Sequence, residues 1–256
     1  MLHTHHEYDT SEIIMYSKEP SLSLLCTHIT RMERPYIFLL LAFLLLQPCV
    51  LQLCQSSNNF TNQPALIAFK SQITFSPNDS VFAGGNWSTT TNFCEWFGVS
   101  CSRRRQRVTA LNPSYVGLRG TISPHIANLS FLVSLGLKNN SFSGFLPHEI
   151  GHLHRLRKLH LSNNLLEGSI PPTIHNCQKL EYLNLHNNTV SGGIPKELGM
   201  LPKLRDLYLS RNSLSGTIPL SLSNMSLEIL TLEFNSLTGP FPLVLFNFSF
   251  LTVLAL

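Results

Sequence analysis

Residues 156–179 read LRKLHLSNNLLEGSIPPTIHNCQK, and residues 180–203 read LEYLNLHNNTVSGGIPKELGMLPK. Both segments open with L-x-x-L-x-L and continue to an asparagine and then a glycine at the same positions. The opening recurs at intervals of 24, 24, 24, 23 and 24 residues, at Leu132, Leu156, Leu180, Leu204, Leu227 and Leu251. A fixed period of this length predicts a solenoid, in which each coil buries its apolar face against its neighbours.

The pattern also predicts which side chains form the interior. Leucines at pattern positions one, four and six are expected to point inward, and in the third coil these and later apolar residues are Leu156, Leu159, Leu161, Leu166, Ile170 and Ile174. The repeated asparagine is expected to turn inward as well, where its amide can bond backbone groups that the bend leaves unpaired. These asparagines are Asn140, Asn164, Asn188, Asn212 and Asn235. We therefore expect an α/β solenoid with a parallel β-sheet on its concave face.

A separate segment, residues 58–107, is expected to cap the open end of the repeats at residues 108–256. Residues 63–73 place Leu66, Phe69 and Ile73 at the spacing of one helical face. Trp87 and Trp96 follow, and large aromatic side chains can cover a terminal coil that would otherwise expose its core. About seven repeats follow the cap, the last one incomplete.

Cysteines and glycosylation sequons indicate the secretory pathway. Cys94 and Cys101 bracket EWFGVS, and a disulfide between them would staple a small cap in an oxidising compartment. Cys177 is left without a partner, and we expect a free thiol in the core. N-x-S/T sequons, which predict glycosylation, occur at Asn59, Asn78, Asn86, Asn128, Asn139, Asn187, Asn224 and Asn247.

An apolar stretch near the start of the chain favours a secretory signal. Residues 36–46 read YIFLLLAFLLL, which is too short to span a bilayer comfortably. A conventional signal peptide would begin at Met32 and cover residues 32–57, with Arg34 supplying positive charge. Residues 1–31 are then a disordered leader or a mis-annotated extension. The alternative is a signal-anchor with a cytoplasmic leader.

Residues 62–256 resemble the start of the ectodomain of plant leucine-rich-repeat receptor kinases. The nearest subgroup contains the receptors for bacterial flagellin and elongation factor and the receptor that confers bacterial-blight resistance in rice. The resemblance lies in ALIAFKSQI at 65–73, CEWFGVSC at 94–101, QRVTAL at 106–111 and NSLSGTIP at 212–219. It implies the plant-specific repeat class, in which the Gly-x-Ile-Pro element forms a second short sheet. It also implies a peptide or protein ligand, a co-receptor kinase as a further partner, and a role in pattern perception and defence signalling at the plasma membrane.

The chain departs from the family pattern in three places. The first coil has Pro113 and Val116 where Leu and Asn are expected, which puts its strand pairing in doubt. The coil that begins at Leu227 is one residue short around Met225 and Ser226. The chain stops at Leu256, on the strand of the seventh coil, and carries no membrane span or kinase motif. The expectation is an N-terminal fragment that is extracellular or held in the endomembrane system, with no enzyme activity and no membrane contact of its own.

Residues between the leucines are expected to face the concave side, because alternate strand residues project to opposite faces. On coils three to six they form a mixed aromatic and charged candidate binding site of Lys158, His160, Tyr182, His186, Asp206, Tyr208, Arg211 and Glu233. Exposed Tyr and Arg side chains are favoured binding anchors. Glycans at Asn139 and Asn187 would shield part of the same sheet.

Other function classes are less favoured by the sequence. The net charge of +4 is small, so a nucleic-acid partner is not indicated. The basic run at Arg103–Arg105 and Arg107 is interpreted as a solvated turn before the first repeat, with a binding patch as the alternative. His148, His152 and His154 lack a convergent carboxylate or cysteine, so no metal, cofactor or catalytic role is expected. The main alternative is a secreted inhibitor of a microbial cell-wall-degrading enzyme that resembles polygalacturonase-inhibiting proteins.

Overall fold

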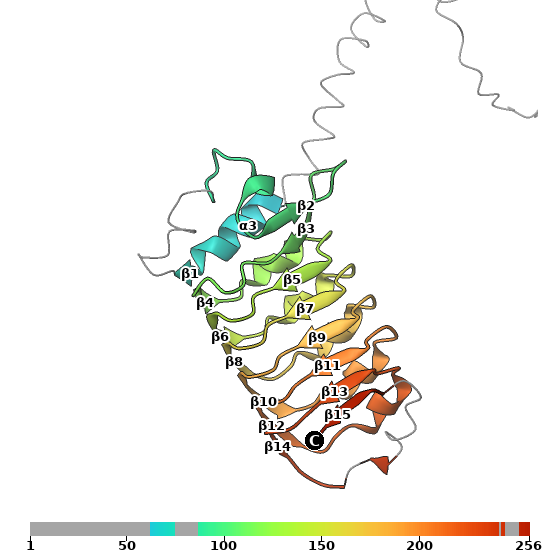
Figure 1. Cartoon of the computed structure of the whole chain (residues 1–256). Coiled ribbons are helices and arrows are strands. Elements are labelled where there is room, and N and C mark those ends of the chain that lie inside the picture. The colour runs from blue at the N-terminus through green and yellow to red at the C-terminus, as the bar shows by residue number, and fades with distance from the viewer. Residues whose placement is uncertain (1–61, 75–86, 241, 244–250) are drawn as a thin grey trace, which may run out of the picture. The chain divides into compact units, whose positions relative to one another are not determined.

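In a computed structural model of the chain, the described residues are 62–74, 87–240, 242–243 and 251–256 (Figure 1). The expected leader at 1–31, the signal peptide at 32–57 and four of the sequons lie outside these ranges. Those four are Asn59, Asn78, Asn86 and Asn247. No helix within the described ranges has the length and apolar character that a membrane crossing requires.

The concave face is one eight-stranded sheet whose strands lie side by side from coil to coil (Figure 1). From β3 onward neighbouring strands are parallel, while β2 pairs antiparallel with β3. In spatial order the strands are β2 (Val99–Cys101), β3 (Val108–Leu111), β5 (Ser134–Gly136), β7 (Lys158–His160), β9 (Tyr182–Asn184), β11 (Asp206–Tyr208), β13 (Ile229–Thr231) and β15 (Val253–Ala255). The expected solenoid with a parallel concave sheet is confirmed.

A second sheet of seven short strands forms another side of each coil. Its members are β1 (Ile73–Thr74), β4 (Arg119–Thr121), β6 (Ser141–Phe145), β8 (Leu165–Gly168), β10 (Thr189–Gly193), β12 (Ser213–Gly216) and β14 (Ser236–Leu237). The second sheet is present, but the expectation that the whole Gly-x-Ile-Pro element lies in its strands was wrong. In the third coil β8 ends at Gly168, whose φ of 70° lies in the left-handed region, and Ile170 and Pro171 follow the strand.

Short 3-10 helices form the convex side. They are η2 (Pro124–Asn128), η3 (His148–His152), η4 (Pro172–Asn176), η5 (Lys196–Met200) and η6 (Leu220–Asn224), while η1 (Phe93–Glu95) belongs to the cap. Four of them begin directly after a proline, and at Pro171 φ is −67°. Because the proline ring fixes φ near this value, it sets the direction in which the chain enters the helix.

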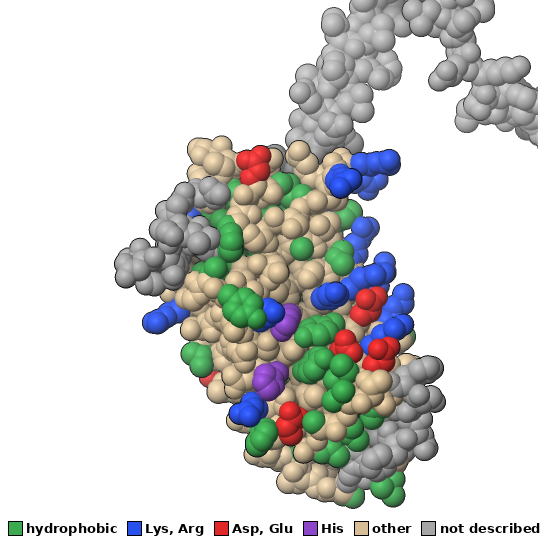
Figure 2. Space-filling model, viewed as in Figure 1, with side chains coloured by type: hydrophobic (Ala, Val, Ile, Leu, Met, Phe, Trp, Pro, Cys, Tyr) green, Lys and Arg blue, Asp and Glu red, His purple; other side chains and the backbone are tan. Residues whose placement is uncertain are grey.

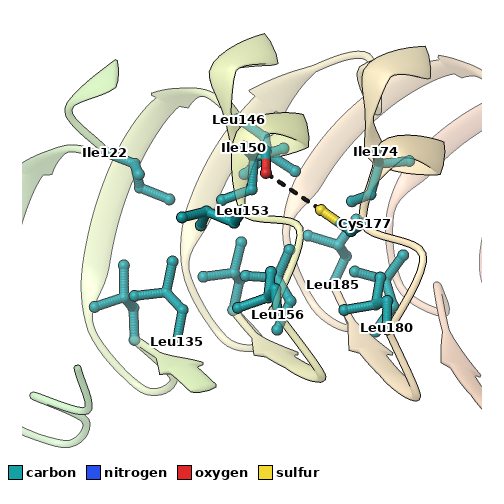
Figure 3. Packing of buried hydrophobic residues seen from close by; sticks show 14 of the residues in the cluster. Ile122, Leu135, Leu146, Ile150, Leu153, Leu156, Ile174, Cys177, Leu180 and Leu185 are labelled. Carbon is teal, nitrogen blue, oxygen red and sulfur yellow. Dashed lines mark hydrogen bonds between the residues drawn. The ribbon is translucent and has the colours of Figure 1, made fainter. Parts of the chain in front are cut away.

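The core runs through the stacked coils as a column of aliphatic side chains (Figure 3). The third-coil set predicted from the sequence is at most 2% exposed. Burial of each large aliphatic side chain contributes about 1.5–3 kcal/mol before conformational entropy is counted. Cys177 is a buried free thiol, as expected; its Sγ lies 3.2 Å from the Ile150 carbonyl oxygen, and burial raises its pKa to about 12.

The inward asparagines bond the backbone of neighbouring coils, as predicted. Asn164 Nδ2 donates to the carbonyl oxygens of Leu137 and Leu161, each at 3.0 Å, and its Oδ1 accepts from the Phe142 amide at 3.0 Å. Asn140, Asn188, Asn212 and Asn235 repeat this arrangement. This asparagine ladder ties the concave strand of each coil to the second sheet of the coil before it.

The cap consists of helix α3 (Asn62–Ser71), a disulfide and stacked aromatic rings. Leu66 and Phe69 are buried as predicted, and the Cys94–Cys101 disulfide is present. The expected helix was too long, because Ile73 lies in β1, which pairs antiparallel with β4 at Gly120. A Cβ on Gly120 would lie 1.9 Å from the Gln72 carbonyl oxygen, so this close approach of two backbones requires glycine.

The two irregular coils keep the register of the sheet. Strand β3 ends at Leu111, before Pro113, and pairs with β5 at Leu135, so the doubt about the first coil is removed. In the shortened coil Thr231 still pairs with Tyr208. The missing residue is therefore accommodated in the turn after η6 rather than in the strand.

Candidate functional site

Register places the outward residues of successive concave strands in columns. One column runs from Ser134 through Lys158, Tyr182 and Asp206 to Ile229, and the next runs from Gly136 through His160, Asn184 and Tyr208 to Thr231. Because all strands in this stretch are parallel and in register, the side chains of one column share a face. The predicted alignment is therefore present, while the role of these residues in binding stays a prediction.

Three aromatic rings form a continuous row across the middle of this face. The ring centroids of His160 and Tyr182 are 5.3 Å apart, and those of Tyr182 and Tyr208 are 5.5 Å apart. All three side chains are half-buried. Such tilted pairs gain about 0.5–1.5 kcal/mol beyond the burial of their area. The row, called the aromatic row below, is thus held in place before any ligand arrives.

Charged groups flank the aromatic row. Burial raises the pKa of Asp206, with the Glu228 carboxylate adding to the effect, and burial followed by Asp206 raises the pKa of Tyr208. Burial, and then Lys138, lowers the pKa of His160 below its usual 6.5. The neutral form of His160 is therefore favoured, and its Nε2 lies 2.9 Å from the Ser162 hydroxyl oxygen.

A hollow of about 770 Å³ adjoins the aromatic row where the concave strands begin. Its lining includes the predicted residues Lys158, Tyr182 and Asp206 together with Glu181, Pro202, Lys203, Leu204, Arg205, Ser226 and Glu228. The hollow is partly open to solvent, and its volume lies within the range of about 300–1,000 Å³ that small-molecule pockets span. A surface that combines aromatic rings, both signs of charge and a hollow is suited to binding.

Sequence reasoning missed a row of charges at the edge of this hollow. The second position of the leucine pattern holds Arg157, Glu181, Arg205 and Glu228 in successive coils. Arg157 and Glu181 approach to 3.5 Å, and Arg205 and Glu228 to 2.9 Å. The alternating signs at one pattern position were visible in the sequence and could have identified this row.

The remaining predicted residues lie farther from the aromatic row. His186 Nδ1 is 2.6 Å from the Ser210 hydroxyl oxygen at the end of the concave strands. Arg211 is not in a column: its φ of 53° places it at the corner after β11, where its guanidinium lies 4.7 Å from the centroid of the Phe234 ring. Glu233 is half-buried in the next coil. These three residues lie just past the ends of β9, β11 and β13, so they form the margin of the surface rather than its centre.

The four described sequon asparagines are exposed. Asn128 and Asn224 end convex helices, whereas Asn139 and Asn187 occupy the corner that follows the concave strands. Asn187 Nδ2 donates to Asn163 Oδ1 at 3.0 Å, so the nitrogen that a glycan would modify takes part in a hydrogen bond. Glycosylation at all four stays a prediction.

Metal-binding geometry is not found within the described ranges, where no group of three or more His, Cys, Asp or Glu side chains is placed to hold an ion. The His160 and His186 rings instead contact serine hydroxyls. What the surface offers is a set of aromatic faces, hydrogen-bonding groups and charges in fixed positions.

Family models match four stretches of the chain. The leucine-rich-repeat N-terminal domain matches residues 63–102, a two-copy leucine-rich-repeat model matches residues 154–196, and a single-repeat model matches residues 131–153 and 203–225. The matches coincide with the cap and with individual coils of the solenoid.

Similar proteins come from Arabidopsis thaliana. The LRR receptor-like serine/threonine-protein kinase EFR is 45% identical over 114 residues, which are 44% of this chain and 11% of EFR. The Arabidopsis receptor kinase HAESA, solved with the peptide hormone IDA and the co-receptor SERK1, superposes with a TM-score of 0.69 at 36% identity over 76% of this chain and 33% of that chain.

The BIR2 ectodomain of Arabidopsis thaliana is a relative that this chain matches over nearly its whole length. It superposes with a TM-score of 0.60 at 32% identity, over 68% of this chain and 93% of that chain. The chain therefore belongs to the family of plant leucine-rich-repeat receptor ectodomains.

Proposed function

We propose that the chain is the ligand-recognition part of a plant receptor-like serine/threonine kinase and that its concave face binds a peptide or protein. The observation that carries this proposal is the aromatic row, which joins three consecutive strands with Lys158 and Asp206 in the adjoining column. Rigid aromatic side chains beside charged groups are typical of residues that dominate binding energy.

The relatives support a peptide as the ligand and a second protein as a further partner. HAESA was solved with a peptide hormone and a co-receptor, and EFR is named as a receptor-like kinase. The chain spans only 11% of EFR and 33% of the HAESA chain, so kinase activity belongs to parts of those proteins outside the match. By analogy, the residues of this chain bind without catalysing, on the outer side of the plasma membrane, in pattern perception and defence.

The direction of ligand approach follows from the position of the hollow and of the sequons. The hollow lies where the concave strands begin, whereas Asn139 and Asn187 lie at the corner where the strands have ended. Glycans at that corner would cover the far margin of the sheet and leave the aromatic row open from the hollow. We therefore place the centre of the site at Tyr182, with Lys158 and Asp206 in contact with polar groups of the ligand.

The inhibitor alternative is less well supported. The similar proteins described above are receptor kinases and receptor ectodomains. An assay of polygalacturonase inhibition by the secreted chain would detect that activity directly, and strong inhibition would favour the alternative.

A displayed library of random peptides tests the proposal. Peptides are enriched on the secreted wild-type chain and then measured on the double variant Tyr182→Ala/Tyr208→Ala. We expect affinity to fall at least about tenfold, since loss of an anchoring aromatic side chain at a binding surface costs upward of about 2 kcal/mol. A convex double variant, His154→Ala/His175→Ala, is the matched control and should bind as wild type.

Two results would contradict the proposal. Enriched peptides that bind the concave double variant as tightly as wild type would place recognition elsewhere. Equal losses in the concave and convex variants would indicate a general effect on folding, which thermal unfolding of each variant would reveal.

A further inference from the structure

The lateral edge where the concave strands begin carries a group of arginines that the proposed concave site does not use. Arg103, Arg104 and Arg105 form the turn between β2 and β3, and Arg155 lies just before β7. All four are exposed, and they line one hollow of about 410 Å³ together with Ser102, Thr109, Phe131 and Val133. Figure 2 shows basic side chains following one another along this edge.

The arginine turn is held by its own hydrogen bonds. The Ser102 amide donates to the Arg107 carbonyl oxygen at 2.8 Å, and the Gln106 amide donates to the Ser102 carbonyl oxygen at 3.1 Å. Cys101, directly before the turn, is tied to Cys94 by the disulfide. The backbone that carries the arginines is therefore fixed by the cap.

The Phe131 ring positions the guanidinium groups of Arg155 and of a fifth arginine, Arg107. The Cζ atom of Arg155 lies 4.0 Å from the centroid of the Phe131 ring, and that of Arg107 lies 4.8 Å from it. Because β5 lies between β3 and β7, these two arginines reach the ring from the coils on either side. Cation–π contact restrains their planar heads, which reduces the entropy lost when they bind an anion.

The positive charge at this hollow is not balanced locally. None of the described residues that line it is acidic. Among the described residues, arginine pairs with glutamate only farther along the edge, in Arg157–Glu181 and Arg205–Glu228. Burial lowers the pKa of Arg107, and the positive charge of Arg105 lowers it further, because the two guanidinium groups repel each other. Guanidinium groups without an acidic neighbour are suited to binding carboxylate oxygens, which they bind in a bidentate manner.

We propose that this hollow, called the arginine hollow below, docks an acidic peptide segment in which carboxylate side chains flank an aliphatic one. The carboxylates pair with Arg103–Arg105 and Arg155 at the rim. The aliphatic side chain contacts Val133 and the methyl group of Thr109 on the floor. Guanidinium groups already lie over the Phe131 ring, so it is not open for stacking by a sugar or a nucleic-acid base.

Fluorescence anisotropy on the full secreted chain tests this inference. The probe is a short labelled peptide that alternates Glu and Leu; the comparison probes alternate Glu and Ser, or Lys and Leu, and an oligogalacturonate of matched charge represents acidic polysaccharide. We expect Arg155→Gln to weaken binding of the Glu-Leu peptide about tenfold, as the loss of a charge-assisted pair implies. Binding should also weaken as salt is added.

A matched variant makes the result specific. Lys196→Gln removes one positive charge on the convex side and should bind the probe as wild type. Equal binding by wild type and Arg155→Gln, or no binding of the Glu-Leu peptide, would overturn the proposal. Tighter binding of oligogalacturonate with the same dependence on Arg155 would assign the hollow to polysaccharide and overturn the peptide assignment.

Discussion

The asparagine ladder and the aromatic row run along the same coils, but the first stabilises the fold and the second forms the proposed binding surface. Asn164 and Asn188 are buried, and each saturates three backbone groups of its own coil and the coil before. Tyr182 and Tyr208 are half-buried and their rings contact each other. The Tyr182 ring also contacts His160, and its hydroxyl oxygen accepts from Asn184 Nδ2 at 2.8 Å. The comparison teaches that one set of positions must keep its residue for the coil to close, whereas the other is free to vary and so can carry recognition.

The largest expected effect on stability distinguishes Asn188, which belongs to the ladder, from its neighbour Asn187, which does not. Asn188→Ala leaves the Leu166 amide without its partner, and a buried unsatisfied group costs about 1–3 kcal/mol. It also removes one of the two side-chain bonds to each of the Leu161 and Leu185 carbonyl oxygens, which keep those from Asn164 and Asn212. We expect the free energy of unfolding in urea to fall by about 2–6 kcal/mol, since the unsatisfied amide costs about 1–3 kcal/mol and each of the two lost bonds about 0.5–1.5 kcal/mol. Asn187→Gly is the control, because glycine tolerates the φ of 53° at that exposed corner and should cost far less. Similar losses in both variants would show that the ladder is not the element that closes the coil.

The next largest effect on stability distinguishes Leu183 from Tyr182, two adjacent residues of β9 that face opposite sides of the sheet. Leu183→Ala removes a fully buried side chain and leaves a cavity, which costs about 2–5 kcal/mol. Tyr182→Ala alters the outer face without opening a core cavity and should cost less than Leu183→Ala, about 1–3 kcal/mol for its two ring contacts together. Urea denaturation of both variants checks the difference. If Tyr182→Ala were the more damaging, the tyrosine would belong to the core rather than to a binding surface.

A smaller effect concerns pH. Burial lowers the pKa of His160 in the folded chain, so the unfolded chain takes up the proton at a higher pH than the folded one does. This contribution to stability is complete above about pH 6.5, the unfolded value, and is lost as pH falls through the lowered folded value. We expect the fall in melting temperature on acidification to be shallower in His160→Gln than in wild type. His175→Gln on the convex side is the control, and a slope unchanged by His160→Gln would contradict the account.

The smallest effect concerns the charge row. Arg205 and Glu228 are 2.9 Å apart, but both side chains are well exposed, and such pairs contribute about 0–1 kcal/mol. Arg205→Gln should therefore leave thermal unfolding within about 0.5 kcal/mol of wild type, while it changes the charge that lines the hollow beside Tyr182. A large loss of stability in this variant would mean that the charge row supports the fold.

Much of the scaffold could be predicted because its chemistry repeats. Leu159, Asn164 and their equivalents occupy positions that the coils after the first fill in the same way, so periodicity alone identified them. The end of β8 at Gly168 was missed because a left-handed glycine, rather than the conspicuous Ile170 and Pro171, ends the strand. Ile73 was placed in the helix because its spacing fits, although pairing with Gly120 draws it into a sheet.

The candidate site was predictable only in part. Strand alternation identified Lys158, Tyr182 and Asp206 as neighbours on one face, because register follows from the repeat. The arginine hollow was not foreseen, since Arg155 lies about fifty residues from Arg104 in the sequence and only stacking of the coils brings both to Phe131. Contacts between coils at the lateral edge depend on side-chain reach, and a repeat pattern does not report that.

Hydroxyl-radical footprinting of the secreted chain, with and without a peptide enriched on it, tests the central claim most directly. Tyr182 and Tyr208 are reactive, half-exposed and on neighbouring strands, so a ligand on the concave face must shield both together. We predict strong protection of these two tyrosines and unchanged labelling of Met200 on the convex side. Protection of Met200 with both tyrosines still fully labelled would contradict the account.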